Sequence, residues 1–336
     1  MDEIIFYSKY NFFFGNYTEY NNSYEIINIQ FPEAIFDWKE PSQKQLKDLE
    51  ENLIFWKKKS KIVFTMNDLK NHYDENNKFL ELFKLVHRYA DGVIHLGKYS
   101  YENYKCLFSF YCKHTVIYHP LYDTLLENFE NNDFQKKFQI NLDKKYVVAV
   151  IGAIRSFEEA RLMLKVFKNI PRKNKILVVP QMIQFTNLPS FWPYRYRRLY
   201  KIVAEFVFCF PLLKKQYFFG FKFVEYSLIV DLLKRTDLMI IPRIRNLNSG
   251  NLFLGLTFDI PMIIPKVGNL TEIATLFDFP TLNLKEMNMK EVISHQVGLK
   301  SNYLVQKGDY IEKKKKFSAS IIAKQYDDFF NIMINQ

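Results

Sequence analysis

The sequence predicts an α/β protein built from two doubly wound domains, each with a parallel sheet. Short apolar runs alternate with segments of helical length along most of the 336 residues, which is the pattern of βαβ units. A chain of this length is too long for one typical core, so two domains of ordinary size are expected. A hydrophobic content of 48% with 25% charged residues is typical of a folded chain rather than a disordered one.

The first predicted domain covers residues 1–140. Its strands are expected in the apolar runs at residues 4–7, 26–31, 62–65, 92–96 and 115–118. Helices are expected at about residues 42–58 and 79–89, with another before the last strand. The stretch 122–145 is rich in Asn, Asp and Lys and is expected to form a linker with one helix.

The second predicted domain covers residues 141–316 and repeats the same alternation. Its strands are expected at residues 147–152, 175–180, 221–224, 238–241 and 262–264, with helices between them. A last helix within residues 317–336 has apolar residues at helical spacing and follows four consecutive lysines. We expect this helix to pack back against the first domain.

Charge and cysteine content limit the partners and the compartment. The net charge of +11 favours an anionic partner, which could be nucleic acid, a phosphate-bearing substrate or an acidic membrane face. Three cysteines, Cys106, Cys112 and Cys209, do not suggest a disulfide framework, so a reducing compartment is expected. The spacing of Cys106, Cys112 and His114 matches no familiar zinc pattern, and ordinary half-buried residues are favoured there.

The N-terminus and the apolar runs give no sign of secretion or of a membrane span. Asp2 and Glu3 stand where a secretion signal would carry positive charge, and no long apolar core follows them. No stretch of about 18 uncharged apolar residues occurs. A cytoplasmic location is therefore expected.

The loop that follows the apolar run 238–241 has the composition of a phosphate site. It carries Arg243, Arg245 and Asn248, and Ser249-Gly250 is expected to begin the next helix. Backbone N–H groups and the positive dipole end of a helix N-terminus attract phosphate, and glycine allows a close approach of the backbone. We interpret this loop as a cradle for a diphosphate.

Two further strand-end positions are candidates for the same site, because open parallel sheets bind ligands at the carboxyl ends of their strands. Arg155 follows the first strand of the second domain and could hold two phosphate oxygens. The alternative is an ion pair with Glu158 or Glu159 on the next helix. Glu272 follows another strand end, where it could bind a sugar or ribose hydroxyl or simply favour a helix N-terminus.

Five short motifs, at residues 152–155, 237–242, 248–250, 261–264 and 268–273, make the second half resemble the donor-binding domain of glycosyltransferases with the GT-B fold. The similarity is greatest to enzymes that build bacterial capsular or exopolysaccharide repeat units. Residues 28–33, 61–72, 89–94 and 116–120 resemble the first half of these enzymes. The resemblance implies two Rossmann-like domains facing a cleft, with an acceptor-binding domain first and a nucleotide-sugar donor domain second.

The chain also departs from the pattern of this family. A His-Asn pair of the family is Asn67-Asp68 here, and acidic Glu158 and Glu159 replace a lysine that often follows the Arg155 position. The two glutamates of many retaining members would fall at Asn246 and Leu254. These departures leave open whether transfer retains or inverts the configuration at the anomeric carbon. They also leave open, as an alternative, an inactive scaffold of polysaccharide assembly.

The chemistry of glycosyl transfer suggests roles for individual residues. Negative charge builds on the departing diphosphate, so fixed donors such as Arg155 and the Ser249-Gly250 loop should contribute most. An inverting enzyme also needs a base near the acceptor hydroxyl, for which Asp68, His72 and His119 are the candidates.

Missing motifs narrow the reaction class. No Asp-x-Asp pair occurs, so transfer without a metal is expected. No Gly-x-Gly-x-x-Gly or Gly-Lys-Ser/Thr loop occurs, which disfavours dehydrogenases, ATPases and kinases.

A basic and aromatic insertion at residues 191–219 suits a membrane interface. Its rings could instead pack into the core, or stack on single-stranded nucleic acid.

The sequence thus predicts a metal-independent glycosyltransferase without a cofactor. Its nucleotide-sugar donor is a substrate, and its acceptor is a glycan expected to be lipid-linked, in surface polysaccharide synthesis. The enzyme is expected on the inner face of the plasma membrane, with an anionic membrane surface and no nucleic acid as partner. The alternative is a non-catalytic basic module for nucleic acid or membrane.

Overall fold

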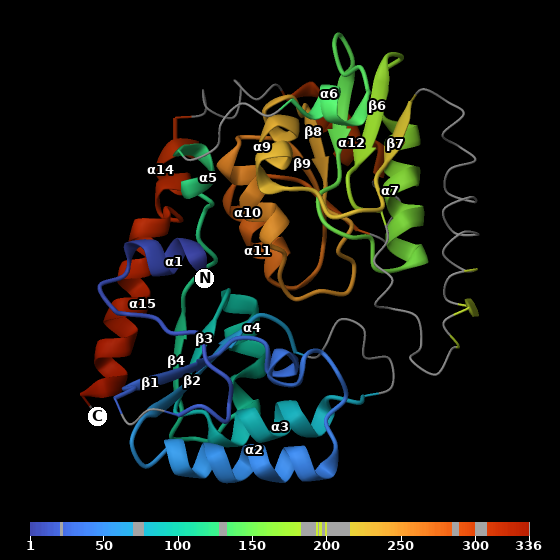
Figure 1. The fold of residues 1–336 in the computed structure, drawn as a ribbon. Coiled ribbons are helices and arrows are strands. Elements are labelled where there is room, and N and C mark those ends of the chain that lie inside the picture. The colour runs from blue at the N-terminus through green and yellow to red at the C-terminus, as the bar shows by residue number, and fades with distance from the viewer. Residues whose placement is uncertain are drawn as a thin grey trace. The chain divides into compact units, whose positions relative to one another are not determined.

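The computed structural model describes residues 1–20, 23–69, 77–127, 133–182, 193, 195, 196, 199, 216–283, 289–299 and 308–335 (Figure 1). The chain divides into two compact units. Unit 1 contains residues 1–121, 245–248 and 315–336, and unit 2 contains residues 122–244 and 249–314. Each unit has its own parallel sheet, so the predicted α/β class with two Rossmann-like domains is confirmed.

Unit 1 is built on four parallel strands in the order β1-β2-β3-β4. The strands are β1 (Ile26–Ile29), β2 (Lys61–Met66), β3 (Gly92–His95) and β4 (Lys113–Val116). Between them lie η1 (Pro32–Phe36), α2 (Gln43–Trp56), α3 (Leu80–Tyr89), α4 (Lys98–Tyr104) and η2 (Lys105–Leu107). Ser42 starts α2 with a capping box to Gln45, which satisfies two backbone donors at the helix start.

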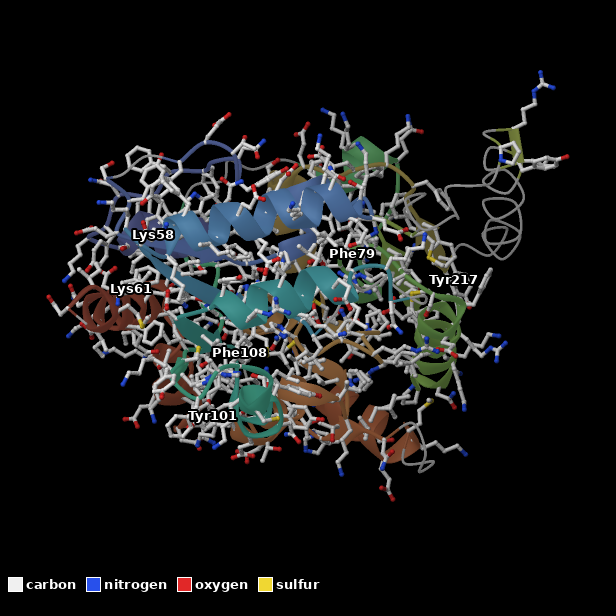
Figure 2. The ribbon with its side chains drawn as sticks, turned by 90° about the horizontal axis from the view of Figure 1, so that it is seen from below. Lys58, Lys61, Phe79, Tyr101, Phe108 and Tyr217 are labelled. Atoms are coloured by element: carbon white, nitrogen blue, oxygen red, sulfur yellow. The ribbon has the colours of Figure 1, made fainter. Side chains whose placement is uncertain are left out.

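Both faces of the unit 1 sheet are covered by helices. Ile62, Phe64 and Met66 of β2 point to the cluster that includes Leu49 of α2, whereas Val63 points to the opposite cluster. This alternation follows from the two-residue period of a strand. Figure 1 shows α2 and α3 on one face and the two terminal helices on the other. Figure 2 shows α2 and α3 alongside each other, with Phe79 just before the first residue of α3.

The chain termini meet in unit 1, where α15 (Ala319–Ile334) packs on α1 (Asp2–Tyr7). The backbone N–H of Lys9 donates to Oδ2 of Asp327 at 3.0 Å. The predicted return of the last helix to the first part of the chain is confirmed. The predicted strand at residues 4–7 is wrong, because this run is helical. Two acidic residues in its first turn complement the helix dipole, and Ile4 becomes buried against α15.

Unit 2 is built on six parallel strands in the order β10-β9-β8-β5-β6-β7. They are β5 (Tyr146–Ala149), β6 (Lys175–Val179), β7 (Tyr217–Phe219), β8 (Leu238–Ile240), β9 (Met262–Pro265) and β10 (Thr281–Leu282). The helices are α5 (Thr124–Glu127), α6 (Phe134–Phe138), α7 (Phe157–Asn169), α9 (Tyr226–Lys234), α10 (Gly250–Thr257), α11 (Gly268–Leu276), α12 (Met289–Gly298) and α14 (Tyr310–Lys315).

The strand order of unit 2 creates a switch point between β5 and β8. From β5 the chain moves outward through β6 and β7, and then returns through α9 to β8 on the other side of β5. Loops after β5 and β8 therefore diverge to opposite faces, which leaves a crevice at their carboxyl ends. One face of the sheet is covered by α7 and α12, and Figure 1 shows α9, α10 and α11 on the other.

Two strand predictions for unit 2 differ from the structure. A strand was expected at residues 221–224, but β7 is formed by Tyr217–Phe219, which pairs with β6. The short edge strand β10 was not predicted, because two residues carry no periodic pattern. Among the described helices, none is long and apolar enough to cross a membrane. Most of the insertion at residues 191–219 lies outside the described residues.

Candidate functional site

A cavity of about 220 Å³ lies at the carboxyl ends of β5, β6 and β7 in unit 2. Its walls come from the loops after these strands, from the first turns of α9 and α10, and from the segment around α5. The lining residues are Tyr122, Leu125, Ile151, Gly152, Pro180, Gln181, Phe223, Val224, Tyr226, Ile229, Asn251 and Leu254. Most of these side chains are apolar or aromatic, which is typical of a small-molecule site.

Gly152 allows the loop after β5 to contact two polar side chains at close range. Its φ of +78° lies in the left-handed region that glycine adopts without strain. A Cβ atom at this position would lie 3.2 Å from Nη2 of Arg243 and 3.3 Å from Nδ2 of Asn251. Asn251 in turn donates to the carbonyl of Ile151 at 2.5 Å. The loop and the first turn of α10 are therefore fixed against each other at the cavity.

A buried ion pair between Arg243 and Glu159 fixes this loop. Nη1 of Arg243 lies 2.8 Å from Oε2 of Glu159, and both side chains are only 4% exposed. Nη2 of Arg243 donates to the carbonyl of Ala153 at 2.9 Å. The same Glu159 oxygen accepts from the backbone N–H of Arg155 at 2.7 Å. Arg243, predicted as a phosphate ligand, thus holds the β5 loop in place with its charge offset by Glu159.

Arg155 lies at the end of this loop and its side chain is half-buried. The sequence left open whether Arg155 binds phosphate or pairs with Glu158 or Glu159. In the structure the contact to Glu159 is made by the backbone N–H of Arg155, while the guanidinium that pairs with Glu159 belongs to Arg243. The pairing partner of Glu159 is therefore 84 residues away in the chain.

The first turn of α10 presents backbone donors at the cavity. The helix begins at Gly250 with Ser249 as its N-cap, as the sequence predicted, and the Ser249 side chain makes no capping hydrogen bond. Asn251 and Leu254 of this helix line the cavity. A helix start of this kind offers N–H groups and a positive dipole end to an anion.

Glu272 lies further into its helix than the sequence suggested. The helix α11 begins at Gly268, whose φ of +48° lies in the left-handed region that glycine adopts without strain. Glu272 is therefore in the second turn of the helix and is half-buried. Its charge is beyond the first few residues where the dipole effect is strongest.

Other predicted residues come together at the carboxyl ends of the unit 1 strands. Asp68 follows β2, and its Oδ1 accepts from the backbone N–H of Leu247 at 3.0 Å. Nδ2 of Asn248 donates to the carbonyl of Asn67 at 2.6 Å. Arg245 is exposed in the same segment, which belongs to unit 1. The structure therefore groups Asp68 and Asn248 in unit 1, and Arg155, Arg243, Ser249 and Gly250 in unit 2.

The two histidine candidates differ in what the structure says of them. Nδ1 of His119 donates to the carbonyl of Pro120 at 2.7 Å. Burial lowers the pKa of His119 to about 4, so the imidazole is neutral at pH 7 and is a weak base. His72 lies outside the described residues.

Sequence reasoning gave no role to Glu33, which belongs to η1 at the carboxyl end of β1. The residue is 3% exposed, and its Oε2 has no hydrogen-bond partner among the described residues. Burial, with a smaller contribution from the charge of Asp68, raises the pKa of Glu33 to about 7. The Pro-Glu pair after the first strand is the only sequence pattern that marks this position.

The possible zinc ligands are separated by their environments. Cys106 is exposed and Cys112 is buried. Nδ1 of His114 lies 3.0 Å from Nε2 of His95. In the described part of the chain, no group of three His, Cys, Asp or Glu side chains is arranged to hold a metal ion.

Comparisons with known proteins identify the fold. No protein-family model and no curated protein sequence matches the chain. The structure of Anabaena HepE in complex with UDP and glucose is similar, with a TM-score of 0.65 and 14% identity. That match covers 93% of this chain and 79% of HepE.

Two synthases are also similar. Sucrose-phosphate synthase from Thermosynechococcus elongatus has a TM-score of 0.61 and 12% identity, covering 93% of this chain and 74% of the synthase. The UDP-forming α,α-trehalose-phosphate synthase from Burkholderia xenovorans has a TM-score of 0.59 and 10% identity, covering 84% of this chain and 70% of the synthase. At these identities the similarity establishes the fold, which is the GT-B fold of nucleotide-sugar-dependent glycosyltransferases.

Proposed function

We propose that this protein is a glycosyltransferase that moves a sugar from a nucleotide-sugar donor to a glycan acceptor, without a metal. The observation that carries the proposal is the cavity of unit 2, which lies beside the N-terminus of α10 at the carboxyl ends of β5, β6 and β7. An apolar pocket next to a helix start suits a nucleoside joined to a diphosphate. The similar HepE structures contain UDP or UDP-glucose, which supports the same ligand class.

The size of the cavity favours a pose in which the nucleoside of the donor lies inside it and the diphosphate lies outside it. Its volume of about 220 Å³ is below the roughly 300–1,000 Å³ of pockets that hold whole ligands. The nucleoside would occupy the cavity beside Tyr226 and Gln181. The diphosphate would lie against the backbone N–H groups at Ser249-Gly250, with Arg155 as its cation.

Stabilisation of the leaving group would then carry most of the catalysis. Breaking the bond between the anomeric carbon and the diphosphate places negative charge on the phosphate oxygens. Fixed backbone donors and Arg155 offset that charge without reorganising. Arg243 contributes indirectly, since its bonds to Glu159 and Ala153 fix the β5 loop. Arg245 and Glu272 stay candidates for contacts to the phosphate and sugar.

Asp68 is the proposed base on the acceptor side. It follows a strand end of unit 1 and is half-buried. His119 is a less suitable base because burial lowers its pKa to about 4. His72 stays a candidate from the sequence alone. We further propose that the acceptor is a lipid-linked glycan of bacterial capsular or exopolysaccharide synthesis, and that the protein works at the cytoplasmic face of the membrane through the insertion at residues 191–219.

Thermal unfolding with nucleotides tests the donor site. A ligand that binds only the folded state raises its stability, by about 2.7 kcal/mol at a hundredfold excess over Kd. We expect one of UDP, GDP, ADP and their sugar conjugates to raise the Tm of the wild type. Arg155→Ala should abolish most of that rise. Arg161→Ala, which removes the same charge from an exposed position on α7, should keep it.

Three outcomes are informative when the release of nucleotide from its sugar conjugate is measured alongside the Tm. A selective rise that is lost only in Arg155→Ala supports the proposed donor site. A rise with no release of nucleotide from its sugar conjugate, with or without added glycan, would indicate a scaffold that binds but does not transfer. No rise with any nucleotide would contradict the proposal and leave a binding module for nucleic acid or membrane.

A further inference from the structure

The loop after β1 presents two exposed aromatic rings beside a buried carboxyl group. Phe31 is 39% exposed and Trp38 is 49% exposed, and their ring centroids lie 5.8 Å apart at an angle of 42°. Glu33 lies between them in the chain and is buried. Two exposed rings in contact offer an apolar surface that a ligand could cover.

The backbone of this loop is fixed at both ends. The carbonyl of Phe31 accepts from the N–H of Ala34 at 2.9 Å, and the carbonyl of Glu33 accepts from the N–H of Trp38 at 2.9 Å. Phe36, between them, is buried in the unit 1 core with 6% exposure. The backbone that carries the two rings is therefore held by the fold, and binding would not have to order this loop first.

Trp38 adopts a backbone conformation that its side chain disfavours. Its φ is +61°, and the preceding Asp37 has a φ of +52°. Asp is tolerated in the left-handed region, whereas a bulky residue there is strained. Glycine or asparagine would fit this position at lower cost. Strain of this kind concentrates at ligand sites, where the side chain is needed in spite of the backbone.

Glu33 places a second unfavourable feature in the same loop. Its Oε2 is buried and has no hydrogen-bond partner among the described residues. A buried polar atom without a partner costs stability, and a buried negative charge costs more. Burial, with a smaller contribution from the charge of Asp68, raises the pKa of Glu33 to about 7. Near neutral pH both protonation states of this carboxyl group are therefore populated.

We propose that Phe31, Trp38 and Asp68 form a subsite for one pyranose residue of an uncharged glycan, with Glu33 as a positioning residue behind Asp68. The C–H face of a pyranose packs against the electron-rich faces of the two rings. The hydroxyl groups donate to the carboxylate of Asp68, which accepts several hydrogen bonds. A protonated Glu33 keeps a second negative charge away from Asp68.

The local charge offers a phosphate-bearing ligand no excess of positive charge. Residues 31–40 contain Glu33, Asp37 and Glu40 with one lysine, and Oε2 of Glu40 is already paired with Nζ of Lys78 at 3.2 Å. Nucleic acid or anionic lipid would therefore gain little electrostatic attraction from this segment, although aromatic rings alone could stack on a base. A neutral polyol that offers an apolar face and many O–H donors satisfies both the rings and the carboxyl groups.

This subsite rests on the proposed function for its role as the acceptor site, but its test needs no nucleotide. Saturation-transfer NMR would be measured with the methyl α- and β-pyranosides of glucose, galactose and mannose. We expect at least one to receive saturation, mainly at the hydrogens of one ring face. Trp38→Ala should reduce the transfer roughly five-fold, which corresponds to the loss of about 1 kcal/mol of ring contact.

Two further variants separate binding from folding. Trp38→Phe keeps a ring and should restore most of the transfer, whereas Tyr111→Ala removes a ring that is 87% exposed elsewhere in unit 1 and should change nothing. Glu33→Gln tests the positioning role. Transfer to the wild type should weaken as the pH rises from 6 to 8, and the variant should lose that pH dependence.

Certain results would overturn the inference. No saturation of any of the six pyranosides would do so, as would equal transfer in the wild type and in Trp38→Ala. A pH dependence that survives in Glu33→Gln would remove Glu33 from the site. Because the donor site is tested separately with nucleotides, a protein that binds a nucleotide but no pyranoside refutes this subsite and not the proposed function.

Discussion

The buried charged groups at the carboxyl ends of the two sheets differ in whether they have partners. In unit 2 the buried charges are paired, since Arg243 and Glu159 lie 2.8 Å apart and both are 4% exposed. In unit 1 the buried carboxyl of Glu33 has an oxygen without a partner among the described residues, and the charge of Asp68 acts on it. The first arrangement fixes a loop, whereas the second leaves a buried carboxyl group whose pKa is close to 7. Under the proposed function, the rigid loop would hold the donor and the carboxyl group would face the acceptor.

Breaking the ion pair of unit 2 should have the largest effect on stability. Arg243→Ala leaves Glu159 as a buried charge without its partner, and we expect a loss of about 3–5 kcal/mol in the free energy of unfolding. Chemical denaturation measures it. Arg235→Ala is the matched control, because Arg235 is 40% exposed beside Asp231 and should cost less than about 1 kcal/mol. Equal losses in both variants would refute the role given to Arg243.

Removing the ionisable group of Glu33 should stabilise the protein in a pH-dependent way. The pKa of folded Glu33 is about 7 because of burial, against an ordinary value of 4.5, so the folded state holds an extra proton between these values. Stability therefore falls as the pH rises from about 4.5 to 7. Glu33→Gln cannot ionise, so it should gain up to about 3 kcal/mol over the wild type at pH 8 and almost nothing at pH 4.

The control for this prediction is Glu81→Gln, since Glu81 is 61% exposed in a surface pair with Lys84. That change should shift stability by less than about 0.5 kcal/mol at either pH. Unfolding at pH 4 and pH 8 measures both variants. A Glu33→Gln variant that is no more stable at pH 8 than at pH 4, relative to the wild type, would refute the buried-carboxyl account.

Filling the space at Gly152 should damage the donor site with a smaller loss of stability. Alanine would be strained at a φ of +78° and would place Cβ 3.2 Å from Nη2 of Arg243. We expect Gly152→Ala to cost about 1–3 kcal/mol and to remove the stabilisation by nucleotide. Gly298→Ala, where nothing lies within 4 Å, should be neutral or slightly stabilising. Retained nucleotide binding in Gly152→Ala would contradict the placement of the diphosphate.

Relieving the strain at Trp38 should have the smallest effect on stability. Trp38→Gly removes a left-handed penalty of about 1–2 kcal/mol but adds roughly 0.4–1 kcal/mol of unfolded-chain entropy. The net change should stay within about 1 kcal/mol, while transfer of saturation to the pyranosides falls about as much as in Trp38→Ala. A large destabilisation by chemical denaturation would mean that Trp38 is retained for the fold and not for a ligand.

The sequence predicts much of this fold because its strands are short apolar runs separated by helices. It misplaces residues 4–7, where four apolar or aromatic positions suit a strand as well as a helix and contact with α15 decides the outcome. It also misses β10, which has only two residues. The positions of Arg155 after a strand and of Ser249 and Gly250 at a helix start could be predicted, because strand ends and helix starts are local features.

Other properties of the site depend on contacts between distant residues. The partner of Arg243 is Glu159, 84 residues earlier in the chain, so the sequence alone could not predict this ion pair. The missing partner of Glu33 and the contact between Phe31 and Trp38 appear only after the loop is folded.

The most direct test of the donor site is a crystal structure with the nucleoside diphosphate that raises the Tm most. The account predicts the base and ribose in the cavity of unit 2, beside Gln181 and Tyr226, and the diphosphate against the backbone N–H groups at Ser249-Gly250. Density for the nucleotide elsewhere, or a diphosphate that does not contact the start of α10, would contradict it.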